Sequence, residues 1–149
     1  MTRRIISRKA LEFLNDHLEK LEDQKKQILE EYYPTPSPGR QEFEQLTKEY
    51  MEYMNQFIRT SQISEMEDKH FPIVIIGSEV EVEEASGGEN YRLRIVAPFS
   101  KESPHEEVEY ASCLSPVGRA LLLKKVNDRV SVHTPSRTFH YTIKSISVS

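Results

Sequence analysis

Few residues in this 149-residue chain have the types and spacing that catalysis or metal binding requires. The five histidines are scattered, and no cysteine or carboxylate completes an evident metal-binding set around them. Only His133 and His140 could approach each other, across a hairpin, and an ordinary cross-strand or surface pair explains that better. The sequence therefore predicts no metal site. The histidines are His17, His70, His105, His133 and His140.

The candidate nucleophiles also lack a catalytic setting. Ser112, Cys113 and Ser115 do not lie in the Gly-x-Ser-x-Gly turn that exposes a hydrolase serine. Cys113 is the single cysteine of the sequence, so it cannot form an internal disulfide, and its apolar neighbours favour a buried, inert thiol. Gly87 and Gly88 lie in a turn-rich stretch rather than in a phosphate-binding loop. We therefore expect no catalytic residue, no enzyme activity and no cofactor.

Composition and charge limit the class of partner. A net charge of −4 argues against a protein that coats nucleic acid, because neutralising phosphates needs a basic surface. A protein partner is the better expectation. The sequence has no apolar run of about 18 residues and no secretory signal, so we expect a cytoplasmic protein that does not bind membranes. Carboxylates gather between Glu79 and Glu109, and basic residues gather from Arg119 onward. This uneven distribution of charge either orients docking on a partner or belongs to an ordinary solvated surface.

The elements that would position a site begin with a helical pattern over residues 9–33. Its apolar residues recur at alternating three- and four-residue steps, with Lys25 at the missing position, while charged residues fill the outer positions. One narrow apolar stripe of this kind needs a partner helix. The stripe consists of Leu11, Leu14, Leu18, Leu21 and Ile28.

A proline-rich segment, Pro34–Gly39, ends this helix because each ring removes an amide donor and disfavours helix before it. A second periodic run begins near Arg40 and predicts a returning helix. The two matched stripes predict an antiparallel coiled-coil hairpin over residues 1–70 with its tip near 34–40. A flexible linker at the prolines is the alternative. The second stripe consists of Phe43, Leu46, Tyr50, Tyr53 or Met54, Phe57 and Met66.

From His70 onward the pattern changes to alternating or continuous apolar residues rich in β-branched types, which predicts strands. Ser115 and Pro116 have the order of a helix N-cap followed by the first helical residue. Residues 71–149 should thus form a small sheet with one short helix, which makes the whole chain α+β. The predicted strands are 73–76 and 78–83, joined as one strand interrupted at Gly77, then 91–97, 108–114, 129–133 and 138–146.

Five phrases of this second half follow one another in a characteristic order. They are Val74-Ile-Ile-Gly-Ser-Glu-Val-Glu-Val82, Tyr91-Arg-Leu-Arg-Ile-Val96, Ser115-Pro-Val-Gly-Arg-Ala-Leu-Leu122, Lys125-Val-Asn-Asp-Arg-Val130, and Val132-His-Thr-Pro135 followed by Tyr141-Thr-Ile-Lys144. Their order and spacing resemble the C-terminal domain of the Gre family of bacterial transcription factors, GreA and GreB. The most specific part is Ser-Pro-x-x-Arg-Ala-Leu with a downstream Thr-Pro hairpin.

This resemblance implies an FKBP-like C-terminal domain that docks on RNA polymerase beside its secondary channel, and we assign the docking contacts to Ser115, Pro116 and Arg119. It also implies that the N-terminal coiled coil enters that channel. Bacterial RNA polymerase is therefore the expected partner, and DNA or RNA would be met only within the elongation complex. Over residues 1–70 the resemblance rests on architecture more than on identities.

The resemblance fails at the hairpin tip. Cleavage factors of the family carry a motif of the type Asp-Leu-Ser-Glu-Asn-Ala-Glu-Tyr there, whose carboxylates help to hold a second Mg²⁺ and its water. This chain has Pro34-Thr-Pro-Ser-Pro-Gly-Arg-Gln-Glu-Phe-Glu-Gln45 instead, without an aspartate. Glu42 and Glu44 are the possible tip acids, and Glu42 falls nearest the family's position. Favourable charge in the first turn of a helix is the alternative explanation of both.

We therefore expect a Gre-like factor that binds RNA polymerase at the secondary channel and modulates elongation without the standard cleavage-stimulating tip. One alternative is transcript cleavage through Glu42 and Glu44, in which Mg²⁺ would enter only through the polymerase active site. Others are prolyl isomerisation by the FKBP-like domain and a role as a helical-hairpin adaptor for another protein.

Overall fold

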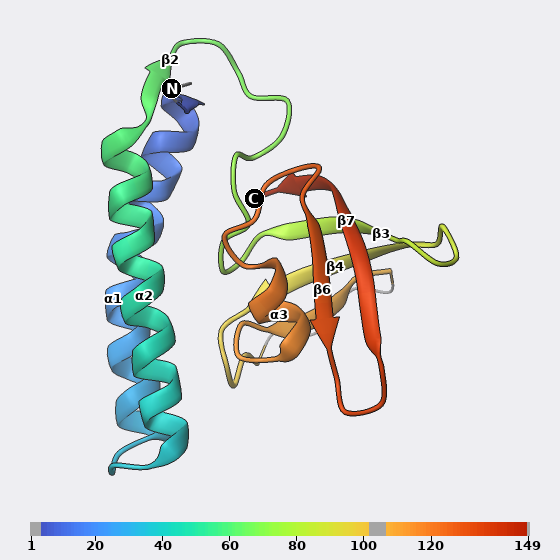
Figure 1. The fold of residues 1–149 in the computed structure, drawn as a ribbon. Coiled ribbons are helices and arrows are strands. Elements are labelled where there is room, and N and C mark those ends of the chain that lie inside the picture. Colours follow the sequence, from blue (N-terminus) through green and yellow to red (C-terminus); the bar gives the residue numbers. More distant parts are fainter. Residues whose placement is uncertain (1–3, 102–106, 149) are drawn as a thin grey trace. The chain divides into compact units, whose positions relative to one another are not determined.

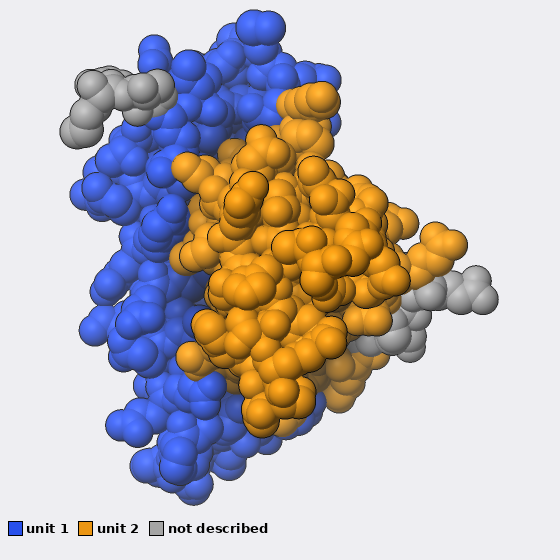
Figure 2. All heavy atoms as spheres, turned by 45° about the vertical axis from the view of Figure 1, so that its right-hand side comes forward, with its two compact units in different colours: residues 1–68 blue, residues 69–149 orange. Residues whose placement is uncertain are grey.

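The computed structural model describes residues 4–101 and 107–148, and the chain divides into two compact units, residues 1–68 and 69–149 (Figure 2). Unit 1 contains two long helices and a two-stranded ladder. Unit 2 contains a five-stranded sheet and a short helix (Figure 1). The α+β class expected from the sequence is confirmed, with the helical hairpin preceding the sheet.

The hairpin of unit 1 consists of α1 (Arg8–Tyr32) and α2 (Pro38–Thr60), which run side by side in opposite directions (Figure 1). Each helix begins at a serine cap, where the hydroxyl accepts a bond from an amide three residues on. Pro38 occupies the first position of α2. An amide N–H at that position makes no hydrogen bond within the helix, so proline, which has none, fits there. Helix α2 therefore begins at Pro38 rather than near Arg40. In the described part of the chain, no helix is long and apolar enough to cross a membrane.

The apolar stripes of the two helices are buried largely as their periodicity predicts. Leu14, Leu21 and Ile28 are buried, whereas Leu11 and Leu18 are half-buried. On the second helix Met54, not Tyr53, belongs to the buried stripe, and a polar residue that the periodicity did not indicate joins it. That residue is Thr47, whose hydroxyl donates to the Phe43 carbonyl at 2.9 Å. The buried residues of α2 are Phe43, Thr47, Tyr50, Met54 and Phe57.

The prediction that the second stripe extends to Met66 is wrong. Helix α2 ends at Thr60, and Met66 is 78% exposed. The hydroxyls of Thr60 and Ser61 donate to backbone carbonyls of the last turn, at 2.8 and 2.6 Å. Ser61 then takes an extended conformation that directs the chain into a strand.

The base of the hairpin is closed by a short parallel ladder that the sequence did not indicate. Strand β1 (Ile5–Ser7) pairs with β2 (Gln62–Ser64). Beyond the ladder, the Ser7 amide donates to the Asp68 carboxylate at 3.1 Å, and Arg8 forms an ion pair with Glu65 at 2.7 Å. Strands of three residues are too short to show a period of two, so only the structure reveals this closure.

The sheet of unit 2 has the order β5-β4-β3-β7-β6. Neighbouring strands are antiparallel except for β5, which is parallel to β4. Helix α3 (Pro116–Leu121) follows β5, and the final hairpin turns over residues 134–137, as expected. The strands are β3 (Glu79–Glu84), β4 (Asn90–Val96), β5 (Glu109–Ser112), β6 (Arg129–His133) and β7 (Thr138–Ser147).

The segment Ile73–Ile76, predicted as a strand continuous with 78–83, is not a strand. All four of its side chains are buried, and Val74 exchanges backbone hydrogen bonds with Leu123 and Lys124 near the end of α3. Gly77 then takes a positive φ of 100° that separates the segment from β3. The continuous apolar run reflects complete burial, which irregular backbone can also provide when its polar groups are paired.

One polar pair lies within the helical hairpin. His17 Nε2 of α1 is 2.6 Å from the Tyr50 hydroxyl of α2, and the two rings meet edge to face. Burial lowers the pKa of His17 from 6.5 to about 4, which the nearby Asp16 carboxylate only partly offsets. The folded hairpin therefore prefers the neutral imidazole.

This preference predicts an acid-sensitive hairpin. Because the folded pKa of His17 lies below the unfolded value, its contribution to stability is present above pH 6.5 and is lost as pH falls through about 4. The loss should be on the order of 2 kcal/mol in the free energy of unfolding, measured by urea titration of helical circular dichroism. His17→Leu should flatten this part of the pH profile, whereas the exposed control His140→Gln should not. Equal slopes for the two variants would contradict the assignment.

Candidate functional site

The hairpin tip is the segment Tyr33–Arg40, and it is a compact turn rather than a long linker. Tyr33 caps α1, since its backbone N–H donates a hydrogen bond to the Leu29 carbonyl at 3.2 Å, and Ser37 caps α2. The ring of Tyr33 stacks on Phe43 at 5.9 Å between centroids, and a Cβ added to Gly39 would lie 3.0 Å from the Tyr33 ring. The prolines therefore connect the two helices in a short packed turn, which is the arrangement that the hairpin-tip interpretation predicts.

Arg40 joins the two sides of the tip. Its Nη1 donates to the Tyr33 carbonyl at the C-terminal end of α1, at 2.8 Å. Its Nε donates to the Glu44 carboxylate at 2.6 Å, one turn further along α2. One guanidinium thus satisfies a helix end and neutralises one of the two candidate tip acids.

Neither candidate acid lies in the first turn of the helix. Because α2 begins at Pro38, Glu42 and Glu44 fall in its second turn, and the first turn holds no acidic residue. The explanation of both residues as first-turn charge is therefore wrong. From Tyr32 to Gln41 the sequence has no carboxylate, so the end of the hairpin offers tyrosine, proline, hydroxyl and guanidinium groups.

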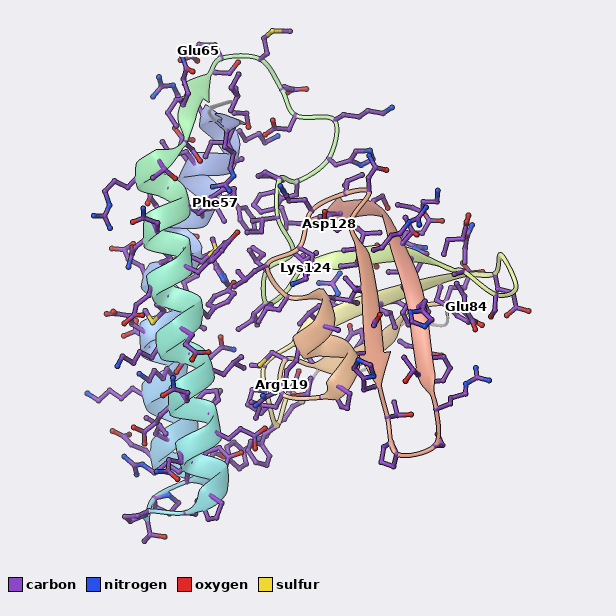
Figure 3. The ribbon with its side chains drawn as sticks, viewed as in Figure 1. Phe57, Glu65, Glu84, Arg119, Lys124 and Asp128 are labelled. Carbon is purple, nitrogen blue, oxygen red and sulfur yellow. The ribbon has the colours of Figure 1, made fainter. Side chains whose placement is uncertain are left out.

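The start of α3 positions the three residues assigned to docking. Ser115 Oγ accepts from the Gly118 amide at 3.1 Å and donates to the Ser112 carbonyl at 2.7 Å, so this hydroxyl is used in the cap. Pro116, at the first helical position, is exposed. Arg119, one turn on, is exposed as well (Figure 3). The structure brings these residues together, with Ser115 holding the helix that carries the other two.

Beside Pro116 lies a groove of about 350 Å³ that the sequence did not indicate; we call it the aromatic groove. Its aromatic side chains come from β4 and β7. Tyr91 meets Tyr141 edge to face at 6.3 Å, and Phe139 stacks on Tyr141 at 6.1 Å. The residues that line it are Glu84, Tyr91, Leu93, Glu109, Pro116, Val117, Val132, Thr134, Arg137, Phe139 and Tyr141.

Charged groups surround these rings. The Tyr91 hydroxyl donates to Glu89 at 2.6 Å, and this bond, with burial and the nearby acids, raises the pKa of Tyr91 to about 12. The Arg137 guanidinium lies 4.1 Å above the Phe139 ring and 3.8 Å from the Glu84 carboxylate. The groove is therefore apolar at its walls, with carboxylates and one paired arginine at its margin.

The remaining chemically capable residues form no further site. Across the final hairpin, His140 Nδ1 lies 3.0 Å from Ser131 Oγ and His133 Nδ1 lies 3.1 Å from Thr138 Oγ1, so each histidine pairs with a hydroxyl. Among the described residues no three metal-ligating side chains cluster, and His105 lies outside them. Cys113 is buried, and burial raises the pKa of its thiol to about 11.

Comparison with known proteins assigns the class. Residues 69–148 match the model of the C-terminal part of transcription elongation factors GreA and GreB. The match takes in the sheet, α3 and the aromatic groove, so unit 2 is a transcription elongation factor domain. It covers more than half of the sequence. The chain belongs to the GreA/GreB family.

Individual relatives match mainly over part of their length. Transcription elongation factor GreA of Syntrophus aciditrophicus is 32% identical over 76 residues, which cover 51% of this chain and 45% of that protein. GreB of Vibrio vulnificus is 35% identical over 94 residues, which cover 63% and 57% respectively. The chain thus spans about half the length of the curated relatives it matches.

Two solved structures also align along almost the whole chain. The GreA/GreB factor of Nitrosomonas europaea aligns over 99% of both chains with 20% identity and a TM-score of 0.48. The GreA factor homolog 1 (Gfh1) protein of Thermus thermophilus aligns over 98% of this chain and 99% of its own, with 21% identity and a TM-score of 0.45.

The cap at α3 predicts a position that accepts only glycine. A Cβ added to Gly118 would collide with the backbone carbonyl of Ser112, which the Ser115 hydroxyl already holds. Gly118→Ala should therefore lower the free energy of unfolding by about 2 to 4 kcal/mol, measured by chemical denaturation. Gly87→Ala is the matched control, because its added carbon meets only a Glu89 side-chain atom at 4.0 Å. A Gly118→Ala variant as stable as that control would contradict the packing described.

Proposed function

We propose that this protein binds bacterial RNA polymerase through unit 2, places its helical hairpin in the secondary channel, and modulates elongation without stimulating transcript cleavage. Membership of the GreA/GreB family supports the choice of partner. The observation that carries the rest of the proposal is the hairpin tip, where no carboxylate occurs from Tyr32 to Gln41 and Arg40 bonds to the Tyr33 carbonyl and to Glu44.

The chemistry of the tip argues against cleavage. Mg²⁺ prefers carboxylate oxygens and keeps several waters, so a second ion needs acids presented together at the end of the hairpin. Glu44 is held by Arg40 at 2.6 Å, and recruiting it to Mg²⁺ would break a charge-assisted bond and leave a guanidinium beside a divalent cation. Glu42 lies in the second turn and supplies at most one carboxylate.

A hairpin of this kind can still act by occupying space. The tip is a well-packed turn, with the Tyr33–Phe43 stack and the Arg40 bonds holding its two sides together. Such a shape in the secondary channel would obstruct nucleotide entry or compete with factors that do cleave. We therefore assign a modulating role, exerted by exclusion rather than by metal chemistry.

Docking is assigned to the surface at the start of α3. Pro116 and Arg119 are exposed there, and Pro116 also lines the aromatic groove. Aromatic and arginine side chains are the types that contribute most of the binding energy at many protein interfaces. Ser115 acts indirectly, because its hydroxyl is used in the cap of α3.

The docking surface predicts two variants that lose polymerase binding while remaining folded. Arg119→Glu reverses an exposed charge, and Pro116→Asp places a carboxylate where a helix N-terminus favours one. Each should weaken binding to core RNA polymerase at least about tenfold, measured by fluorescence titration of the labelled full chain. Arg129→Glu, at an exposed position of β6, is the matched control and should bind as the wild type does.

Two outcomes would count against the proposal. Undetectable binding of the wild-type chain would remove the polymerase as partner and favour a hairpin adaptor for another protein. Unchanged binding by both docking variants, with the control also unchanged, would place the contact elsewhere on the chain.

A further inference from the structure

Strand β1 binds the segment of chain that leads from the hairpin to unit 2. It pairs in parallel with β2, and the Gln62 amide donates to the Arg4 carbonyl at 2.7 Å. Ser7 is both the last residue of β1 and the N-cap of α1, so no loop separates this strand from the helix that follows it. The pairing therefore attaches the start of the connecting segment directly to the hairpin.

Two side-chain contacts extend this attachment beyond β2. The Arg8 guanidinium lies 2.7 Å from the carboxylate of Glu65, which follows β2 directly (Figure 3). The backbone N–H of Ser7 donates to the Asp68 carboxylate at 3.1 Å. Both contacts come from the junction of β1 and α1. The connecting segment is thus held on unit 1 from Gln62 as far as Asp68.

Unit 2 holds the chain again three residues after Asp68. The Phe71 amide donates to the carbonyl of Ile146, in β7, at 2.9 Å. Only Lys69 and His70 lie between these two anchors, and within the part of the chain that the structure describes neither makes a hydrogen bond or an ion pair. The connection between the two units is therefore two residues long.

We infer that β1 is a strap that holds residues 62–68 on the hairpin and leaves Lys69 and His70 as the hinge between the units. With the strap closed, three Cα–Cα steps join the anchors and reach at most about 11 Å. With the strap open, the last fixed residue of unit 1 would be Ser61, whose hydroxyl bonds to the Phe57 carbonyl, and the reach would grow to about 35 Å. The N-terminal strand thus sets how far unit 2 can move from the base of the hairpin.

Such a strap matters for any partner that binds the hairpin and unit 2 together. A short connection keeps the second unit near its site once the first is bound, whereas a long connection lowers that effective concentration. An exposed ion pair and one amide–carboxylate bond close the strap beyond β2, so it can open locally while the helices stay folded. The inference concerns the free chain and does not rest on polymerase binding.

Distances between spin labels on the two units of the full chain test the inference. The labels would be placed at exposed positions by Lys48→Cys in α2 and Arg129→Cys in β6, while the native Cys113 is buried. A strap variant, Arg8→Glu with Asp68→Ala, should broaden the distribution of label distances at least about twofold, because the connection becomes longer. Pulsed electron paramagnetic resonance measures this width.

Two controls separate the strap from a general effect of charge. Lys9→Glu with Glu67→Ala makes the same charge changes at neighbouring exposed residues and should keep the narrow distribution of the wild type. Arg8→Glu with Glu65→Arg exchanges the partners of the ion pair and should keep it too. All of these variants should retain the helical circular dichroism of the wild type.

Any of four results would overturn the inference. A wild type already as broad as the strap variant would mean that no strap operates, and a folded strap variant as narrow as the wild type would mean that other contacts hold the segment. Equal broadening in the Lys9 and Glu67 control would assign the effect to charge alone. Loss of helical circular dichroism in the strap variant would show that these contacts hold the hairpin itself.

Discussion

The bonds made by the Arg40 guanidinium are the interaction on which the hairpin end depends. They join the carbonyl that ends α1 to a carboxylate on the second turn of α2, and so hold the two helices across a connection of only five residues. The same bonds decide the chemistry of the end, because the cation that closes the turn also removes Glu44 from the acids available to a metal ion. Closure of the tip and loss of a metal-binding carboxylate thus have a single cause.

A comparable arrangement at α3 determines what unit 2 can present. The Ser115 hydroxyl accepts from the Gly118 amide and donates to the Ser112 carbonyl at the end of β5. Gly118, which has no Cβ, allows the helix to approach that carbonyl closely. Pro116 is thereby fixed at the margin of the aromatic groove and Arg119 on the exposed side of the helix. The proposed docking surface and the groove are therefore parts of one structure that a single cap holds in place.

Sequence reasoning succeeded where local patterns dominate. Neighbouring residues are enough to indicate three elements: the heptad of α1, the Ser-Pro start of α3 and the alternating final hairpin. It failed where structure depends on distant contacts: the β1–β2 ladder has only three residues a side, and Ile73–Ile76 is buried without being a strand. The aromatic groove was missed for the same reason. Tyr91 and Tyr141 lie far apart in sequence and meet only through the register of β4, β3 and β7, which shifts at a bulge between Glu81 and Val82.

The central claim, a GreA/GreB family member whose tip does not support cleavage, is tested most directly in backtracked elongation complexes. Transcript cleavage would be followed with Mg²⁺ and either the wild-type chain or its Glu42→Ala, Glu44→Ala variant, while polymerase binding is recorded in parallel. The account predicts that both proteins bind and that neither raises cleavage above the polymerase alone. Cleavage stimulated by the wild type and lost in the double variant would contradict it, because the two acids would then supply the chemistry that Arg40 is argued to prevent.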